Sequence, residues 1–120
     1  MTVDYGAGHD FGDSGIIYEG QPTGSSAVLV TATAQDSFVS RAVAVNASTA
    51  SVTVSLWHGI AGAANTTGNE LANAVTCPAN ADTVVFDAGD DAPLTMQHGD
   101  VIRGLCSVSG AVVLRIFGKA

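Results

Sequence analysis

Charged side chains are scarce in this chain of 120 residues. Only 12% of its residues are charged, which is about half of the roughly 25% that soluble domains carry. A solitary domain needs a charged surface to stay in solution, whereas a subunit covered by neighbours needs less of one. The deficit therefore favours a protein that works in an assembly.

Basic residues are the scarcest of the charged ones. They are Arg41, Arg103, Arg115 and Lys119, against eleven acidic residues, and the formal net charge is −7. Nucleic-acid binding needs a basic patch that neutralises phosphates, and four scattered cations do not provide one. An acidic surface is also repelled by an anionic membrane. We therefore expect neither nucleic acid nor membrane as a partner.

Cysteines are few and long apolar runs are lacking. Cys77 and Cys106 are too few for a disulfide scaffold, and both lie in or beside apolar strand patterns, which favours buried free thiols over a bridge. No apolar run approaches the length of a membrane span, and residues 1–6 do not resemble the start of a signal peptide. We expect folding in a reducing cytoplasm.

Motifs of catalysis and metal binding are missing as well. No histidine has a second His or Cys at ligand spacing, and the chain has no nucleophile elbow and no phosphate loop. We expect His58 to cover a strand end and His98 to lie in a surface turn. The aspartates at 87–91 do not follow the order of a calcium loop, and a solvated acidic turn is the favoured interpretation. The sequence predicts no enzyme, catalytic residue, metal or cofactor.

The chain does contain a succession of short β-patterns. Apolar, β-branched or alternating segments predict strands at 15–19, 27–32, 38–46, 51–58, 70–76, 83–87, 100–108 and 111–118. For 70–76 a short helix is the alternative, because Leu71 and Val75 lie four residues apart. Turn-like residues at 46–50 and at Ser109-Gly110 predict hairpins between the flanking strands. The expected fold is all-β, a single β-sandwich or jelly-roll-like domain of seven to eight antiparallel strands.

Alternation also predicts which side chains face the core. In the strand at 51–58 the apolar residues alternate cleanly with polar ones. In the strand before it, Val39, Val43 and Val45 are expected on one face, with Arg41 intruding.

Residues 1–26 differ in composition from the rest. They are rich in Gly, Asp and Ser and cannot bury enough apolar surface to fold by themselves, so we divide the chain into an extended N-terminal arm at 1–26 and a β-sandwich domain at 27–120. A flexible tail and an arm that orders against a neighbouring subunit both remain open. In the second case its anchors are Tyr5, Phe11, Ile16, Ile17 and Tyr18.

The last strand is apolar on both faces. Val113 and Phe117 oppose the apolar residues of the other face, and only Arg115 interrupts them. One face of a strand in a two-layer sandwich normally meets water. The second apolar face predicts either a cover of loop or arm or, as we favour, a subunit interface through Val113 and Phe117.

Trp57, the single tryptophan, lies on the polar face of its strand. An exposed tryptophan can stack on a sugar ring, which keeps open a ligand platform of the carbohydrate-binding type. Large aromatic side chains are more often buried or at interfaces. We favour packing of Trp57 beneath the 59–69 loop or at an interface.

Four segments of the chain resemble a known class of protein. They read Val43-Ala-Val-Asn-Ala-Ser, Val52-Thr-Val-Ser-Leu-Trp, Leu94-Thr-Met-Gln-His-Gly-Asp-Val-Ile-Arg-Gly and Val112-Val-Leu-Arg-Ile-Phe-Gly. Over residues 27–118 the chain is similar to small β-sandwich structural proteins of tailed bacteriophages. These occur as head decoration, head–tail and tail components.

The resemblance implies a protein of the virion, assembled in the host cytoplasm, that forms a symmetric homo-oligomer with a trimer favoured. It offers no catalytic residues. The expected function is that of a capsid decoration, or cement, protein docked on major capsid proteins. A neck, tail or fibre module of the virion is one alternative, and a receptor- or glycan-binding β-sandwich module is the other.

Overall fold

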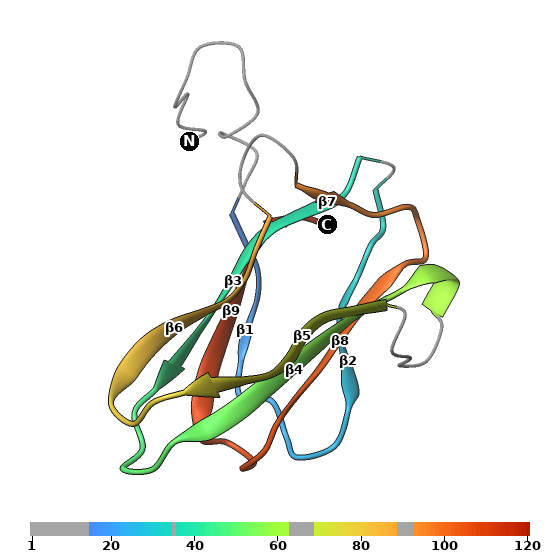
Figure 1. Cartoon of the computed structure of the whole chain (residues 1–120). Helices are drawn as coiled ribbons and strands as arrows, with labels where there is room; N and C mark the ends of the chain where they lie inside the picture. The colour runs from blue at the N-terminus through green and yellow to red at the C-terminus, as the bar shows by residue number, and fades with distance from the viewer. Residues whose placement is uncertain (1–14, 35, 63–68, 89–92) are drawn as a thin grey trace, which may run out of the picture.

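The structure, a computed structural model, describes residues 15–34, 36–62, 69–88 and 93–120. Within these residues the chain forms nine strands and one short 3-10 helix (Figure 1). The elements are β1 (Gly15–Gly20), β2 (Ala27–Thr31), β3 (Phe38–Asn46), β4 (Val52–Gly59), η2 (Ile60–Gly62), β5 (Glu70–Cys77), β6 (Ala81–Asp87), β7 (Leu94–Thr95), β8 (Val101–Cys106) and β9 (Val112–Lys119). The predicted all-β sandwich is confirmed, and the segment at 70–76 is strand, not helix.

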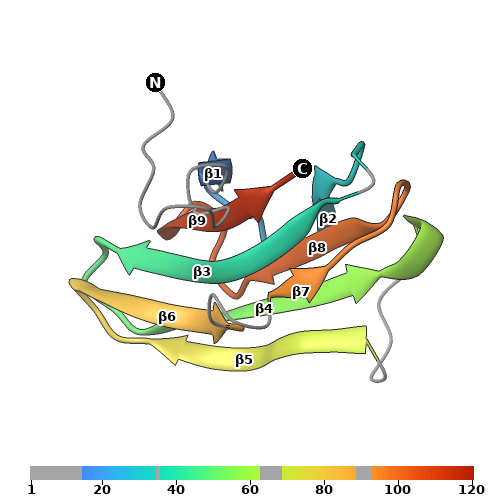
Figure 2. The same cartoon turned by 90° about the horizontal axis from the view of Figure 1, so that it is seen from above.

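The strands lie in two packed sheets with the order of a jelly roll. Sheet A has the order β1-β9-β3-β6, with β7 also paired to β3, and sheet B has the order β2-β8-β4-β5 (Figure 2). Every pairing is antiparallel. Four of the pairs join the strands from the outside of the chain inward: β1 with β9, β2 with β8, β3 with β6 and β4 with β5. The chain is thus one long antiparallel hairpin rolled into two layers, with β7 as a two-residue addition.

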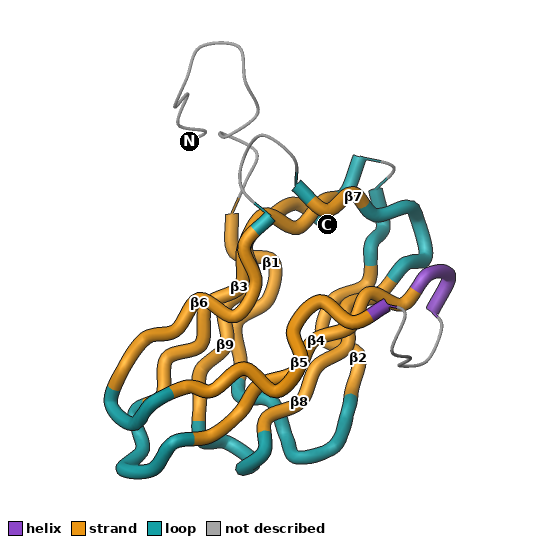
Figure 3. Tube along the Cα trace, in the orientation of Figure 1, coloured by secondary structure: helices purple, strands orange, loops and turns teal. Residues whose placement is uncertain are grey.

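Four connections cross between the sheets at one end of the molecule, all within the described residues (Figure 3). They follow β1, β3, β5 and β8. Backbone hydrogen bonds join these crossings in pairs: Gly110 N–H donates to Pro22 O at 3.2 Å, and Asn80 N–H donates to Ser48 O at 3.2 Å. These bonds tie the crossings at this end of the sandwich to one another through the backbone.

The two hairpins predicted from turn residues are wrong. β3 and β4 lie in different sheets, as do β8 and β9, so the segments at 47–51 and 107–111 are crossings between layers. The local chemistry is that of a turn, since Gly110 has a positive φ of 76°. Turn residues reverse the chain, but the partner of the next strand is chosen by long-range register.

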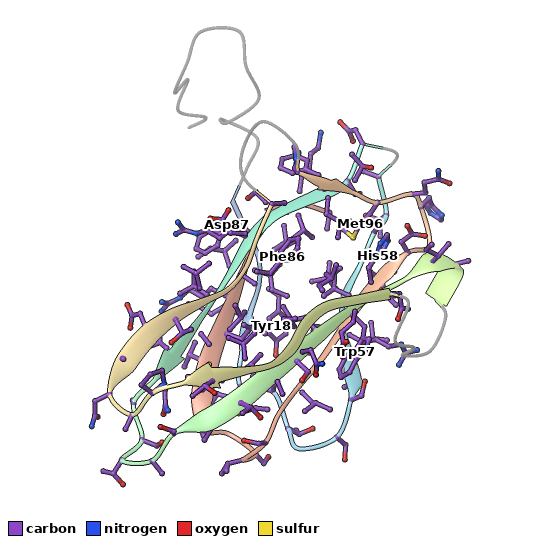
Figure 4. All side chains as sticks on the ribbon, in the orientation of Figure 1. Tyr18, Trp57, His58, Phe86, Asp87 and Met96 are labelled. Atoms are coloured by element: carbon purple, nitrogen blue, oxygen red, sulfur yellow. The ribbon has the colours of Figure 1, made fainter. Side chains whose placement is uncertain are left out.

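The core between the sheets is made by alternate residues of each strand. On β9 the inward side chains are fully buried, and on β4 the apolar face predicted from alternation is the buried one. Phe86 and Met96 also lie between the sheets (Figure 4). The inward residues of β9 and β4 are Val112, Leu114, Ile116, Val52, Val54 and Leu56.

A β-bulge reverses the faces of β3. The register shifts between Val39 and Arg41, where Ser40 is the extra residue. Val39 is buried, but Val43 and Val45 face outward with Arg41, so the predicted common face of the three valines is wrong. One extra residue moves all later side chains to the other face. The inward residues beyond the bulge are Ala42, Ala44 and Asn46.

The two cysteines are buried free thiols, as predicted. Cys77 is opposite Val52 and Cys106 is opposite Val54, so the two lie on strands separated by β4. Strands two places apart are separated by about 10 Å, beyond the roughly 7 Å that a disulfide can span between Cα atoms. Burial, with a smaller contribution from Cys106, raises the pKa of the Cys77 thiol, which disfavours its thiolate form.

Gly118 allows β9 to approach β3 closely. A Cβ at this position would overlap the backbone carbonyl of Phe38, which cannot move without breaking the sheet. We predict that Gly118→Ala lowers the free energy of unfolding by about 2–3 kcal/mol, measured by urea denaturation. Gly15→Ala is the control, because no atom lies within 4 Å of the added methyl. Equal losses in the two variants would contradict this account.

Candidate functional site

The outer face of sheet A holds the interface residues predicted on the last strand. Because the odd-numbered residues of β9 face outward, Val113, Arg115 and Phe117 are partly exposed there. Their neighbours come from β1, β3 and β6. We define the sheet A face as Ile16, Glu19, Arg41, Val43, Val45, Asp82, Val84, Asp87, Val113, Arg115 and Phe117.

Cross-strand rows on this face mix apolar and charged side chains. In one row Ile16 pairs with Phe117, Phe117 with Arg41, and Arg41 with Asp87. The Arg41 guanidinium lies 5.4 Å from the centroid of the Phe117 ring, a cation–π contact. Ile16 keeps 52% of its surface exposed. Aromatic and arginine side chains next to exposed aliphatic ones are characteristic of protein interfaces.

The next row repeats the mixture. Glu19 pairs with Arg115 in register and accepts a hydrogen bond from its Nε. Beyond Arg115 come Val43 and Val84, the latter 50% exposed. An ion pair this exposed adds little to folding stability. Both charged side chains remain exposed enough to contact a partner.

The other predicted arm residues differ in position. Ile17 lies at the bulge of β1, and Tyr18 pairs with Ile116 and packs against the core (Figure 4). Burial raises the pKa of the Tyr18 hydroxyl. Both side chains therefore contribute to the protein's own interior. Tyr5 and Phe11 lie outside the described residues.

A shallow hollow of about 280 Å³ continues the sheet A face toward the closed end of the sandwich. Val45 and Val113 of the face form one side of it, and Gln21, Ala47 and Ala111 are among its other walls. The lining is mostly apolar, and the volume is enough for one aromatic side chain. The hollow extends the apolar part of the face beyond the strands.

Trp57 lies on the outer face of sheet B, between Glu70 of β5 and Arg103 of β8. Val28 of β2 pairs with Arg103 and completes the row. Trp57 itself is partly exposed. A tryptophan ring between a carboxylate and a guanidinium offers a stacking surface with hydrogen-bonding groups on both sides.

A largely buried His–Asp pair, at the end of the sandwich opposite to the four crossings, was missed from the sequence. His58 Nε2 lies 2.9 Å from Asp100 Oδ2, and the two side chains are 15% and 7% exposed. The carboxylate also accepts the N–H of Ala61 at 3.0 Å and of Gln97 at 3.1 Å. His58 does cover a strand end as expected, but its partner is 42 residues away. One sequence signal could have pointed to the pair: Asp100 directly follows Gly99, a turn residue, and directly precedes a predicted strand.

The contacts of this pair are structural. They hold together the end of β4, η2 and the turn before β8. Burial pushes the pKa of Asp100 up, but the Ala61 and Gln97 amides and His58 outweigh it, and the pKa is lowered. The carboxylate is therefore held in its ionised form.

His98 is exposed in a turn, as predicted. Among the residues that the structure describes, no group of three or more His, Cys, Asp or Glu could hold a metal ion. The aspartates at 90 and 91 lie outside those residues. The described part of the chain also has no helix of the length and apolarity needed to cross a membrane.

Comparison with known proteins returns no match among family models, curated proteins or solved structures. The grounds for a function are therefore the topology, the two outer sheet faces and the charge distribution.

We predict that Asp100→Asn destabilises the fold and flattens its acid sensitivity. The variant keeps the size of the side chain but turns an NH₂ group toward at least one N–H donor, so the free energy of unfolding at pH 7 falls by about 2–3 kcal/mol. Because the folded pKa lies below the reference value of 3.8, the carboxylate stabilises fully above that pH, and this stabilisation disappears as the pH falls through the folded pKa.

Urea denaturation at pH 7 and at stepwise lower pH measures both effects. The difference between wild type and Asp100→Asn should shrink as the pH falls below 3.8. A difference that stays constant down to the acid transition would contradict the prediction. Asp36→Asn is the control, because it removes an exposed ion pair with Lys119 and should change stability little.

Proposed function

We propose that the chain is a structural subunit of a phage particle, and in first place a capsid decoration protein that docks through the sheet A face. The observation that carries the proposal is that sheet A presents apolar side chains on both of its faces. Its inner side is the core, and its outer side still presents Ile16, Val84 and Phe117 to solvent. A subunit that neighbouring proteins cover in an assembly would need such a second apolar face.

Two further observations support the proposal. Viral capsid domains recur with the jelly-roll architecture, although the fold by itself also serves lectins and cupin-type proteins. The low charge content of 12% suits a surface that is largely covered in an assembly. The resemblance of residues 27–118 to phage structural proteins supports the particle as the proposed place of assembly.

In this function the protein acts by adding buried area. A homo-oligomer, favoured as a trimer, seats on a symmetric gap between major capsid proteins and bridges them. Each bridged contact removes apolar surface from water at about 25 cal/mol per Å². Such a cement raises the force needed to separate capsid subunits without any chemical step. Neck, tail and fibre positions would use the same faces in a smaller ring.

The proposal predicts that the chain is a stoichiometric component of particles. Quantitative mass spectrometry of gradient-purified virions should find it at a copy number comparable to that of the major capsid protein. A copy number that is a small fraction of the capsid protein would assign the chain to the neck, tail or fibre. Complete absence from particles would overturn the virion proposal.

A glycan-binding module is the second candidate, favoured by the row Glu70–Trp57–Arg103 on sheet B. Sugar rings stack on tryptophan, and their hydroxyls bond to carboxylate and guanidinium groups. In a phage particle this face would recognise a cell-surface glycan. The row lies on the sheet opposite to the proposed docking face, so the two activities do not compete for surface.

For this second function we predict that a glycan hit found on an array shifts the emission of Trp57, the single tryptophan of the chain. Trp57→Ala should lower the affinity for that glycan by about tenfold or more, since loss of stacking on an aromatic side chain costs about 1–3 kcal/mol. Val84→Ala, on sheet A, is the matched control and should leave the affinity unchanged. An array without hits would remove the candidate.

A further inference from the structure

We propose that two copies of the chain dock face to face through their sheet A faces, related by a two-fold axis that passes over the Val43–Val84 pair. Such a contact is isologous, so a group that meets a different group of the second copy does so twice. The contact closes at two copies, whereas the resemblance to phage proteins favours a trimer. It concerns the purified chain and does not rest on the virion proposal; on a particle, a capsid contact would replace the second copy on this face.

The outer strands of both sheets are poorly suited to association by sheet extension. β1 and β6 border sheet A, and β2 and β5 border sheet B. Each of the four strands has a register irregularity in its pairing with the inner strand, and the extra residues include Ile17, Leu29, Leu71 and Val85. Bulges twist an edge away from further pairing. Association between copies is therefore expected through a face and not along an edge.

Two opposite charges on the sheet A face have no ion pair among the described residues. They are the exposed side chains of Arg41 on β3 and Asp82 on β6. Asp87 is opposite Arg41 in register, but the guanidinium lies over the Phe117 ring of β9, on the side of β3 away from β6. Strand spacing puts the Cα atoms of Arg41 and Asp82 about 14 Å apart, too far for a pair within one copy.

The register places these two charges symmetrically about the Val43–Val84 pair. Along β3, Arg41 lies two residues before Val43. Along β6, Asp82 lies two residues before Val84, and because the strands are antiparallel this displacement has the opposite direction. A two-fold axis between facing sheets, over the valine pair, exchanges the two positions. Arg41 of each copy then meets Asp82 of the other, and one geometry forms two ion pairs.

The same axis brings apolar side chains together. Val43 and Val84 lie beside the axis, where each meets its own counterpart, and Val84 is 50% exposed in the single chain. Phe117 is the neighbour of Arg41 in one row, and Val45 is the neighbour of Asp82 in the other. The exchange of rows therefore also places Phe117 over Val45 of the second copy.

The other charges of the face do not oppose this arrangement. Arg115 lies near the axis, but Glu19 already neutralises it within each copy. Two such neutral pairs repel each other little when they approach. Asp87 lies on the outer strand β6 and falls at the border of the contact. The charges at the centre are therefore the two new ion pairs and the two existing ones.

The size of the face sets the expected strength. Four strands about 4.8 Å apart, each with three outward positions about 6.8 Å apart, bury on the order of 1,000 Å² in total when two faces meet. This area is at the lower end of specific interfaces. We therefore expect a dimer that dissociates in the micromolar range, and a concentration series from about 1 µM to 1 mM covers it.

The first experiment measures self-association of the full-length chain by size exclusion with light scattering. Arg41→Glu and Asp82→Arg should each raise the dissociation constant about tenfold or more, because two like-charge contacts replace two ion pairs. Glu70→Arg, the same kind of change on sheet B, is the matched control and should stay within about twofold of wild type. Circular dichroism checks that each variant keeps its β-fold.

Mixing the two weakened variants tests the symmetry of the contact. In a mixed dimer the new glutamate of one copy meets the new arginine of the other, while the unaltered Asp82 and Arg41 pair as in the wild type. Association should therefore return in an equimolar mixture of Arg41→Glu and Asp82→Arg. Higher salt should weaken both the wild-type dimer and the mixed one.

Chemical cross-linking locates the axis. Facing sheets lie about 10 Å apart, so two thiols at position 84 are beyond the reach of a disulfide but suit a bismaleimide with a spacer of about 10 Å. Val84→Cys should form covalent dimers about tenfold faster than Val28→Cys. Val28 is a matched control, since it is 44% exposed on sheet B. The native Cys77 and Cys106 are fully buried and do not compete for the reagent.

Four results would overturn the proposal. They are a wild-type chain that stays monomeric throughout the series, equal weakening by Glu70→Arg and Asp82→Arg, a mixture that associates no better than its components, and equal cross-linking at positions 84 and 28. Each concerns purified protein. The copy number in particles, and with it the virion proposal, has its own test.

Discussion

The buried side-chain amide of Asn46 holds together the end of the sandwich at which the chain changes sheets. Its Nδ2 donates to the carbonyl oxygens of Ala50 and Cys77, both at 2.9 Å, and its Oδ1 accepts from the backbone N–H and the hydroxyl of Ser48. Asn46 and Ala50 bracket the crossing from β3 to β4, while Cys77 ends β5 in the other sheet. The bonds to Ser48 and Ala50 are local, whereas the bond to Cys77 joins residues 31 positions apart and ties the crossing after β3 to the end of β5. Because the amide is fully buried, an arrangement that separated β3 from β5 would leave one of its N–H groups without this partner, at a desolvation cost.

With the crossings held at one end, the sandwich presents two outer faces of different character. The sheet A face combines Arg41 and Arg115 with acidic and exposed aliphatic side chains, and the sheet B face centres on Trp57 between Glu70 and Arg103. The His58–Asp100 pair lies at the opposite end, where it links the end of β4 to the turn before β8. A sandwich with two chemically distinct outer faces suits a protein that works by binding other molecules.

Prediction from sequence succeeded where buried and outward residues alternate regularly along a strand. The alternation in β4 and β9 identified buried and outward faces correctly, because period two is a local property. It failed on β3, where one extra residue at Ser40 exchanged the faces, and it missed the two-residue β7. The outward positions of Val113 and Phe117 on β9 follow the predicted alternation, whereas those of Val43 and Val45 on β3 do not, since the bulge turned them outward beside Val113. The His58–Asp100 pair escaped because partners 42 residues apart leave no pattern in a single sequence.

The amino-acid sequence by itself determined the all-β class, the positions of eight strands, the free thiols and the shortage of charge, because each follows from composition or from short-range periodicity. The jelly-roll order, the sheet to which each strand belongs, the gathering of Arg41 and Arg115 on one face and the placing of Trp57 between Glu70 and Arg103 were settled in three dimensions. Strand pairing is a choice among many registers of similar local energy, and it is made by the burial of the whole inner surface and by long-range polar contacts such as the bond from Asn46 to Cys77.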